Sequence, residues 1–299
     1  MNFRHHTVAL AATGLCLCLF AACGSDDDED SSGGDSASSS KPAAFAITTS
    51  ESGKKISIDA PEEVEAGLTE ITLENTGKGP HDAQLVRVDG DHSAEEVISE
   101  VIDSGEGAPT PEWAFGGGGV ATTPPGQTGR ATQVFEPGTY YLVDTESSGG
   151  EGEGASNAKR GGIVKFEVTG EASGDLPDTE ATIVANEYSF EATGLKAGKN
   201  EVTFENAGKE LHHTIALPLN KGATLADATK AFGSEEEPAG PPPVDFESIA
   251  ATTVLEGGLS QVTELELKKG KYVLVCFISD RAGGPPHVAK GMISEATVE

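Results

Sequence analysis

The stretch YVLVCFISDRAGGPPHVAKGMISEATV, residues 272–298, contains the most informative pattern in the sequence. Its first part is an apolar run, which is typical of a strand covered on both faces. Cys276 follows this run, His287 comes after ten intervening residues, and Met292 after four more. Pro285 and Pro286 stiffen the chain before His287. The pattern predicts a strand, a restrained loop rich in metal-ligand side chains, and a final strand.

This stretch has a diverged counterpart in the first half of the chain. PGTYYLVDT (137–145) matches KGKYVLVCF (269–277), and AGLTEITLEN (66–75) matches AGKNEVTFEN (197–206). The repeat is about 130 residues long, which is the size of a whole domain rather than of a solenoid unit. Both halves alternate apolar and polar residues as half-buried strands do, and glycine- and proline-rich turns separate these strands.

The fold class that follows is all-β: two tandem Greek-key β-sandwiches, each with one short inserted helix. Ser93 and Glu96 form the pattern of a capping box at the start of the first helix, and Thr224 precedes the second. We expect the domains at 44–171 and 181–299, joined by a linker at 172–180.

The donor types in the C-terminal stretch suit copper. Two imidazoles, a thiolate and a long axial thioether make up copper electron-transfer sites, whereas zinc seldom recruits Met. Upstream, the adjacent pair His212 and His213 offers a second imidazole. Strand alternation puts His213 on the face of its apolar neighbours and favours it, whereas alignment of the two halves pairs His212 with His81. Both histidines remain candidate ligands, and we prefer His213.

These residues resemble the cupredoxin, or blue copper, family. The HVAKGM hexapeptide and the His-to-Met spacing are similar to those of plastocyanin-like proteins, and the longer gap from Cys to His is nearer to the type 1 site of copper nitrite reductases. The resemblance implies one mononuclear copper site in the C-terminal domain. Its ligands would be Cys276, His287, Met292 and one of the two upstream histidines.

The first half retains only one of these ligands. Asp144, Asn157 and Gly162 stand where the second half has Cys276, His287 and Met292, and His81 persists. We therefore expect the domain at 44–171 to bind no copper in this way.

The N-terminus reads as an export signal. An apolar run ends in Phe20-Ala21-Ala22-Cys23, which resembles the lipobox of bacterial lipoproteins. We expect a lipoprotein signal peptide at 1–22, lipid on Cys23, and a disordered acidic Ser/Gly tether at 23–43. Cys276 is then the single free thiol of the exported chain.

Composition narrows the range of functions. The chain has 49 acidic against 20 basic residues and a net charge of −29, which argues against nucleic acid as a partner. With seven histidines, two of them in the signal, a second catalytic copper site is not expected, and neither is enzyme activity. The sequence favours a single-electron carrier, lipid-anchored at the outer face of the cytoplasmic membrane, with a redox partner protein. The alternative is a cell-surface binding lipoprotein or a copper chaperone or storage protein.

Overall fold

The computed structural model describes residues 41–147, 156–233 and 240–299, and the all-β prediction is confirmed there. The expected signal peptide, Cys23 and all but the last three residues of the expected tether lie outside the described residues. Strand β1 begins at Ala43, and no helix in the described ranges is both long enough and apolar enough to span a bilayer.

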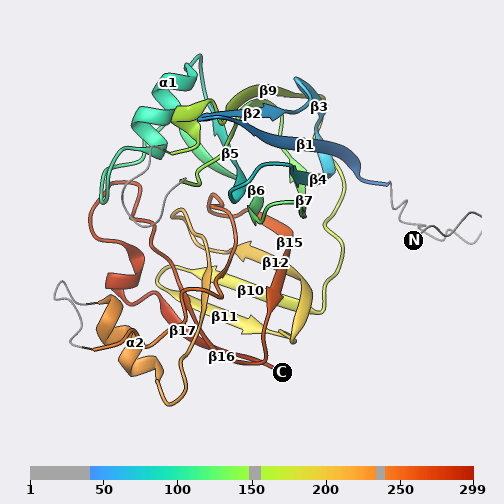
Figure 1. The fold of residues 1–299 in the computed structure, drawn as a ribbon. Coiled ribbons are helices and arrows are strands. Elements are labelled where there is room, and N and C mark those ends of the chain that lie inside the picture. The colour runs from blue at the N-terminus through green and yellow to red at the C-terminus, as the bar shows by residue number, and fades with distance from the viewer. Residues whose placement is uncertain (1–40, 148–155, 234–239) are drawn as a thin grey trace, which may run out of the picture. The chain divides into compact units, whose positions relative to one another are not determined.

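The first β-sandwich spans residues 43–169 and has two facing sheets (Figure 1). The strands of its first sheet are β1 (Ala43–Ser52), β2 (Lys55–Asp59), β4 (Gly67–Asn75) and β7 (Thr128–Phe135). Those of its second sheet are β3 (Glu63–Glu65), β5 (His81–Val88), β6 (Ala114–Thr123), β8 (Gly138–Val143) and β9 (Ile163–Thr169). Strands β1 and β4 pair in parallel although they are close in sequence. The chain between them passes through β3, which belongs to the second sheet.

The second β-sandwich spans residues 181–298 and repeats this arrangement. Its first sheet contains β10 (Ala181–Asn186), β11 (Ser189–Thr193), β12 (Gly198–Asn206) and β15 (Ser260–Leu267). Its second sheet contains β13 (Ile215–Pro218), β14 (Ala250–Ala251), β16 (Gly270–Val275) and β17 (Ile293–Val298). Strand β10 pairs in parallel with β12, as β1 does with β4, so the internal repeat is a repeat of topology.

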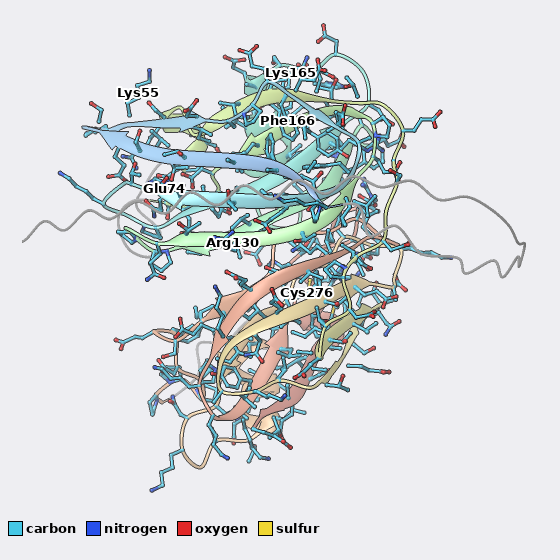
Figure 2. All side chains as sticks on the ribbon, turned by 90° about the vertical axis from the view of Figure 1, so that its right-hand side faces the viewer. Lys55, Glu74, Arg130, Lys165, Phe166 and Cys276 are labelled. Carbon is cyan, nitrogen blue, oxygen red and sulfur yellow. The ribbon has the colours of Figure 1, made fainter. Side chains whose placement is uncertain are left out.

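Each sandwich encloses its own apolar core. The aromatic rings of Phe45, Phe135 and Phe166 contact one another between the sheets of the first sandwich. In Figure 2, Phe166 lies inside this sandwich, whereas Lys55 and Lys165 point away from it. The second core includes Phe204 and also Cys276 and Met292, so the predicted ligands lie at the edge of a packed interior rather than on a loose loop.

The two inserted helices begin where the capping boxes predict. Ser93 accepts a hydrogen bond from the Glu96 N–H at the start of α1 (Ala94–Glu96), which continues as one π-helical turn, η1 (Val97–Ile102). Thr224 and Asp227 cap α2 (Leu225–Phe232) in the same reciprocal way. Both caps satisfy backbone N–H groups that have no partner within the helix.

The two sandwiches share one sheet, which the sequence did not predict. Strands β7 and β15 pair antiparallel over three residue pairs, so that their first sheets join in the order β11-β10-β12-β15-β7-β4-β1-β2. Side chains strengthen this boundary. Gln84 donates to the Val254 carbonyl and accepts from the Val254 N–H, and Arg281 donates to the Ala114 carbonyl.

Candidate metal centre

Three chain segments converge on one end of the second sandwich. His212 precedes β13 and forms a two-way backbone bridge with Leu255. Cys276 directly follows β16, and His287 opens the 3-10 turn η3 (His287–Lys290). Gly291 ends that turn with φ 98°, a conformation that glycine adopts without strain, and so directs Met292 back toward β17.

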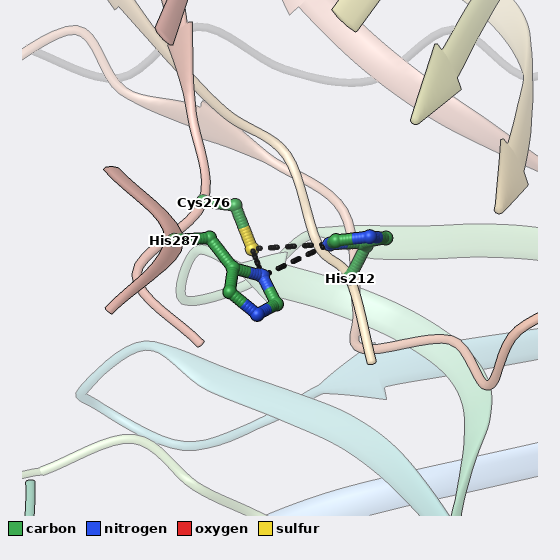
Figure 3. Close-up of side chains that lie close together, drawn as sticks. All are labelled: His212, Cys276 and His287. Atoms are coloured by element: carbon green, nitrogen blue, oxygen red, sulfur yellow. Dashed lines mark hydrogen bonds between the residues drawn. The ribbon is translucent and has the colours of Figure 1, made fainter. Parts of the chain in front are cut away.

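The side chains of His212, Cys276 and His287 face one another (Figure 3). The two Nδ1 atoms are 3.1 Å apart, and the Cys276 Sγ lies 3.6 Å from the Nδ1 of His287 and 3.8 Å from that of His212. Bonds from a first-row transition metal to nitrogen and sulfur are about 2.0–2.3 Å long, so two donors on one ion lie about 3–4 Å apart. The three side chains therefore fit one metal ion.

The environment keeps both imidazoles neutral near pH 7. Burial and, to a lesser extent, the adjacent His287 ring lower the pKa of His212 to about 4. Burial likewise lowers the pKa of His287, against the opposing effect of Asp280. Neutral rings offer the lone pairs that a metal needs. Burial raises the pKa of the Cys276 thiol to about 11, so a bound cation must displace the thiol proton.

Met292 completes the donor set. Its side chain is fully buried in the core cluster that contains Cys276, and its N–H donates to the His287 carbonyl over 2.9 Å. Imidazole, thiolate and thioether together are the donors of a type 1 copper site, and zinc sites rarely include Met. Among its described residues, the C-terminal sandwich thus has one buried His-Cys-His-Met cluster suited to copper, which confirms the predicted cofactor.

The preference for His213 is corrected in favour of His212. Burial does alternate from His212 to Ala216, but the prediction took the wrong face of β13 to line the core. Ile215, on the face of His213, packs in the cluster that contains residues of α2, whereas Ala216, on the face of His212, packs in the cluster that contains Cys276 and Met292. The ring of His213 turns elsewhere, and its Nε2 accepts the Phe277 N–H over 3.0 Å.

Three residues beside the ligands went unnoticed in the sequence. Asp280, Lys290 and Tyr188 gather against the outer edge of the His287 ring. Asp280 and Lys290 lie in the quoted stretch, where a charged pair within a ligand loop was an available signal. Tyr188 lies in the turn between β10 and β11, and nothing in its local sequence connects it with the site.

The first sandwich has a polar cluster at the corresponding place. His81 Nδ1 lies 2.5 Å from the Asp144 carboxylate, and the Asn157 amide donates to both oxygens of that carboxylate over 3.1 Å. The backbone also corresponds. The Gly162 N–H donates to the Asn157 carbonyl over 2.8 Å, as Met292 does to His287. Direct hydrogen bonds occupy the space that a metal ion would take.

No family model and no curated protein sequence matches the chain. Among solved structures, it is similar to a reduced auracyanin from Roseiflexus castenholzii, with 20% identity over 43% of this chain and 99% of that one, at a TM-score of 0.28. It is also similar to the copper nitrite reductase of Nitrosomonas europaea, with 15% identity over 87% and 94% of the two chains, at a TM-score of 0.27.

These TM-scores are low, so the fold assignment rests on the strand order and on the ligand cluster. Both sandwiches have the same two-sheet order with a parallel pair between their first and third long strands. In the second sandwich, His212 comes from before an early strand, and the other three donors come from the connection between the last two strands. The chain therefore has a tandem cupredoxin fold, with a type 1 copper ligand set in its second sandwich.

Proposed function

We propose that the protein is a single-electron carrier, held at the outer face of the cytoplasmic membrane by lipid on Cys23, that exchanges electrons with a redox partner protein. One observation carries this proposal: His212, Cys276, His287 and Met292 are all fully buried. A ligand set closed to solvent leaves no room for a substrate to bind the metal, whereas an electron can still tunnel to it. When bound, copper supplies a couple between Cu(II) and Cu(I).

The same burial weighs against the alternative of a copper chaperone or storage protein. A chaperone must hand over its ion, which requires ligands that an acceptor protein can reach. The ligand set here includes imidazole, which suits Cu(II), as well as the sulfur donors that suit Cu(I). A site that serves both oxidation states suits electron exchange. Because the ligand set is buried, we propose no enzyme activity at this site. Because the net charge is −29, we propose no nucleic-acid partner.

The test is to load the purified protein with Cu(II) and to record its visible and EPR spectra and its voltammogram. We expect one copper per chain, an intense thiolate-to-copper absorption and a reversible one-electron wave. Binding of copper without such absorption, or a strong preference for Cu(I) without a reversible wave, would favour storage or transfer of the ion instead.

The membrane anchor needs its own test, because Cys23 lies outside the described residues. Labelled fatty acid is expected to enter the wild-type protein during expression in a lipoprotein-processing bacterium. The Cys23→Ala variant should lack the label. Label in that variant would contradict the anchor but not the copper site.

A further inference from the structure

The outer edge of the His287 ring is closed by a carboxylate. His287 Nδ1 faces Cys276 and His212, and His287 Nε2 lies 3.0 Å from an Asp280 carboxylate oxygen. The arrangement assigns the proton of the neutral ring to Nε2, which donates to Asp280, and leaves the Nδ1 lone pair for the metal. Hydrogen bonds of this kind fix the orientation of a metal-bound imidazole and raise its basicity.

Asp280 is itself held in place from two sides. The Tyr188 hydroxyl donates to one of its carboxylate oxygens over 3.0 Å, and the Lys290 ammonium forms an ion pair with the other. An ammonium group and a hydroxyl group that both donate to this carboxylate stabilise its ionised form. The ligand His287 therefore has a fixed negative charge behind it.

Tyr188 occupies its position at a conformational cost. Its φ is 65°, which makes it the one non-glycine residue with positive φ in the described parts of the chain. Residues with a Cβ seldom adopt this conformation, least of all with a bulky ring. The tyrosine ring meets that of His287 edge to face at 5.4 Å, and the Lys290 ammonium lies 5.1 Å above it. Strain at a residue that touches a ligand is a mark of a functional constraint.

The described residues of the first sandwich, which leave out 148–155, are arranged differently at the corresponding place. Arg160 stands in the place of Lys290, three residues after Asn157, and it donates directly to the Asn157 side chain over 2.8 Å. The turn that corresponds to Glu187–Tyr188 is Gly53–Lys54, where the positive φ falls on glycine. Among the described residues, the tyrosine and the strained turn thus accompany the ligand set rather than the fold.

We propose that Asp280, oriented by Tyr188 and Lys290, is a positioning residue that holds the copper ligand His287 and lowers the reduction potential of the site. This inference rests on the proposed function. A negative charge hydrogen-bonded to a ligand stabilises the doubly charged ion more than the singly charged ion. Lys290 offsets part of that charge. Removing Asp280 and removing Lys290 should therefore move the potential in opposite directions.

The test compares the potentials of copper-loaded Asp280→Asn, Lys290→Met and wild-type protein. Loss of an outer-shell partner costs about 10–100-fold in metal affinity. In Asp280→Asn, we expect such a loss of affinity for Cu(II) and a smaller loss for Cu(I). The reduction potential then rises by about 59 mV for each tenfold difference between the two losses. Lys290→Met should lower it. Glu264→Gln is the matched control, because it removes a carboxylate that pairs with Lys199 rather than with a ligand.

Shifts of the same sign in both variants would indicate mere structural damage and would overturn the inference, as would an unchanged potential in Asp280→Asn. Copper-free protein supplies a second readout. The His287 Nε2–H is expected to exchange slowly in proton NMR of the wild type and to lose this protection in Asp280→Asn. Rapid exchange in the wild type would also overturn the inference. A wild type that binds no copper would instead refute the proposed function, whatever the NMR shows.

Discussion

The two sandwiches place different side chains in one backbone frame. At the corresponding positions, the first has Asp144 and Asn157 in direct hydrogen bonds to His81, and the second has Cys276 and His287 spaced as metal donors. The 3-10 turn η2 (Ala158–Arg160) ends at Gly161 with φ 102°, and η3 ends at Gly291 with φ 98°. In the first sandwich, polar contacts to the Nδ1 atom of the buried histidine thus take the place that metal donors have in the second, and the backbone frame is the same.

The largest expected effect comes from replacing Cys276 of the second sandwich with aspartate, the residue that the first sandwich has at the corresponding position, Asp144. Cys276→Asp removes the thiolate, so the intense absorption should vanish and copper affinity should fall by more than about 100-fold, since outer-shell losses alone cost about 10–100-fold. Spectroscopic titration with Cu(II) measures both quantities. The control is Asp144→Asn in the first sandwich, which should leave the titration unchanged. Persistent absorption in Cys276→Asp would mean that another thiolate binds copper.

A second comparison separates the neighbouring histidines. His212→Gln removes a donor from the cluster and should abolish the type 1 spectrum. His213→Gln should retain it, because a glutamine oxygen can still accept the Phe277 N–H that His213 now accepts. The measurement is the EPR spectrum of each copper-loaded variant. The reverse result would restore the assignment that strand alternation favoured.

The polar cluster around His81 in the first sandwich predicts that the stability of the fold depends on pH. Burial raises the pKa of Asp144 to about 6 from a model-peptide value of 3.8. The folded state thus binds the extra proton, and this group's contribution to stability is complete below about pH 4 and is lost as the pH rises through about 6. At 1.36 kcal/mol per pKa unit, the loss is about 2–3 kcal/mol.

Asp144→Asn cannot titrate and should lack that loss. Urea denaturation of the copper-free proteins at several pH values gives the free energy of unfolding of wild type and variant. The change with pH in the difference between these two free energies measures the loss. A difference that stays constant from pH 4 to 6 would show that Asp144 ionises normally.

The smallest expected effect concerns Gly162, which stands where the second sandwich has Met292. A Cβ on Gly162 would lie 2.7 Å from the Asn157 carbonyl oxygen, so Gly162→Ala forces the backbone to shift and should cost about 1–2 kcal/mol of stability. Gly79→Ala is the control, because its Cβ would meet only the Glu51 carboxylate, at 3.3 Å. Equal unfolding free energies for the two variants would show that the first sandwich has room for a side chain there.

Much of the fold and most of the ligand set could be predicted because they depend on local patterns. Alternation and capping boxes indicate strands and helix starts, and the spacing of Cys276, His287 and Met292 belongs to one continuous stretch. The choice between His212 and His213 failed because the apolar face of β13 that contains Ile215 packs with residues of α2 rather than in the core that contains Cys276, and the local pattern does not distinguish these two faces. Asp280 and Tyr188 come together through tertiary contact alone, which no single segment records.

The pairing of β7 with β15 could not be predicted either. Each of these strands lies at the edge of its own sheet, and nothing in either half of the sequence indicates that the two edges pair with each other. Unpaired strand edges invite other chains to add to them and so promote aggregation. In this molecule, β7 and β15 each cover part of the other's edge over three residue pairs. The sandwich without copper ligands therefore shields one edge strand of the copper-binding sandwich, and removing it would leave the hydrogen-bonding groups of β15 open to a neighbouring chain.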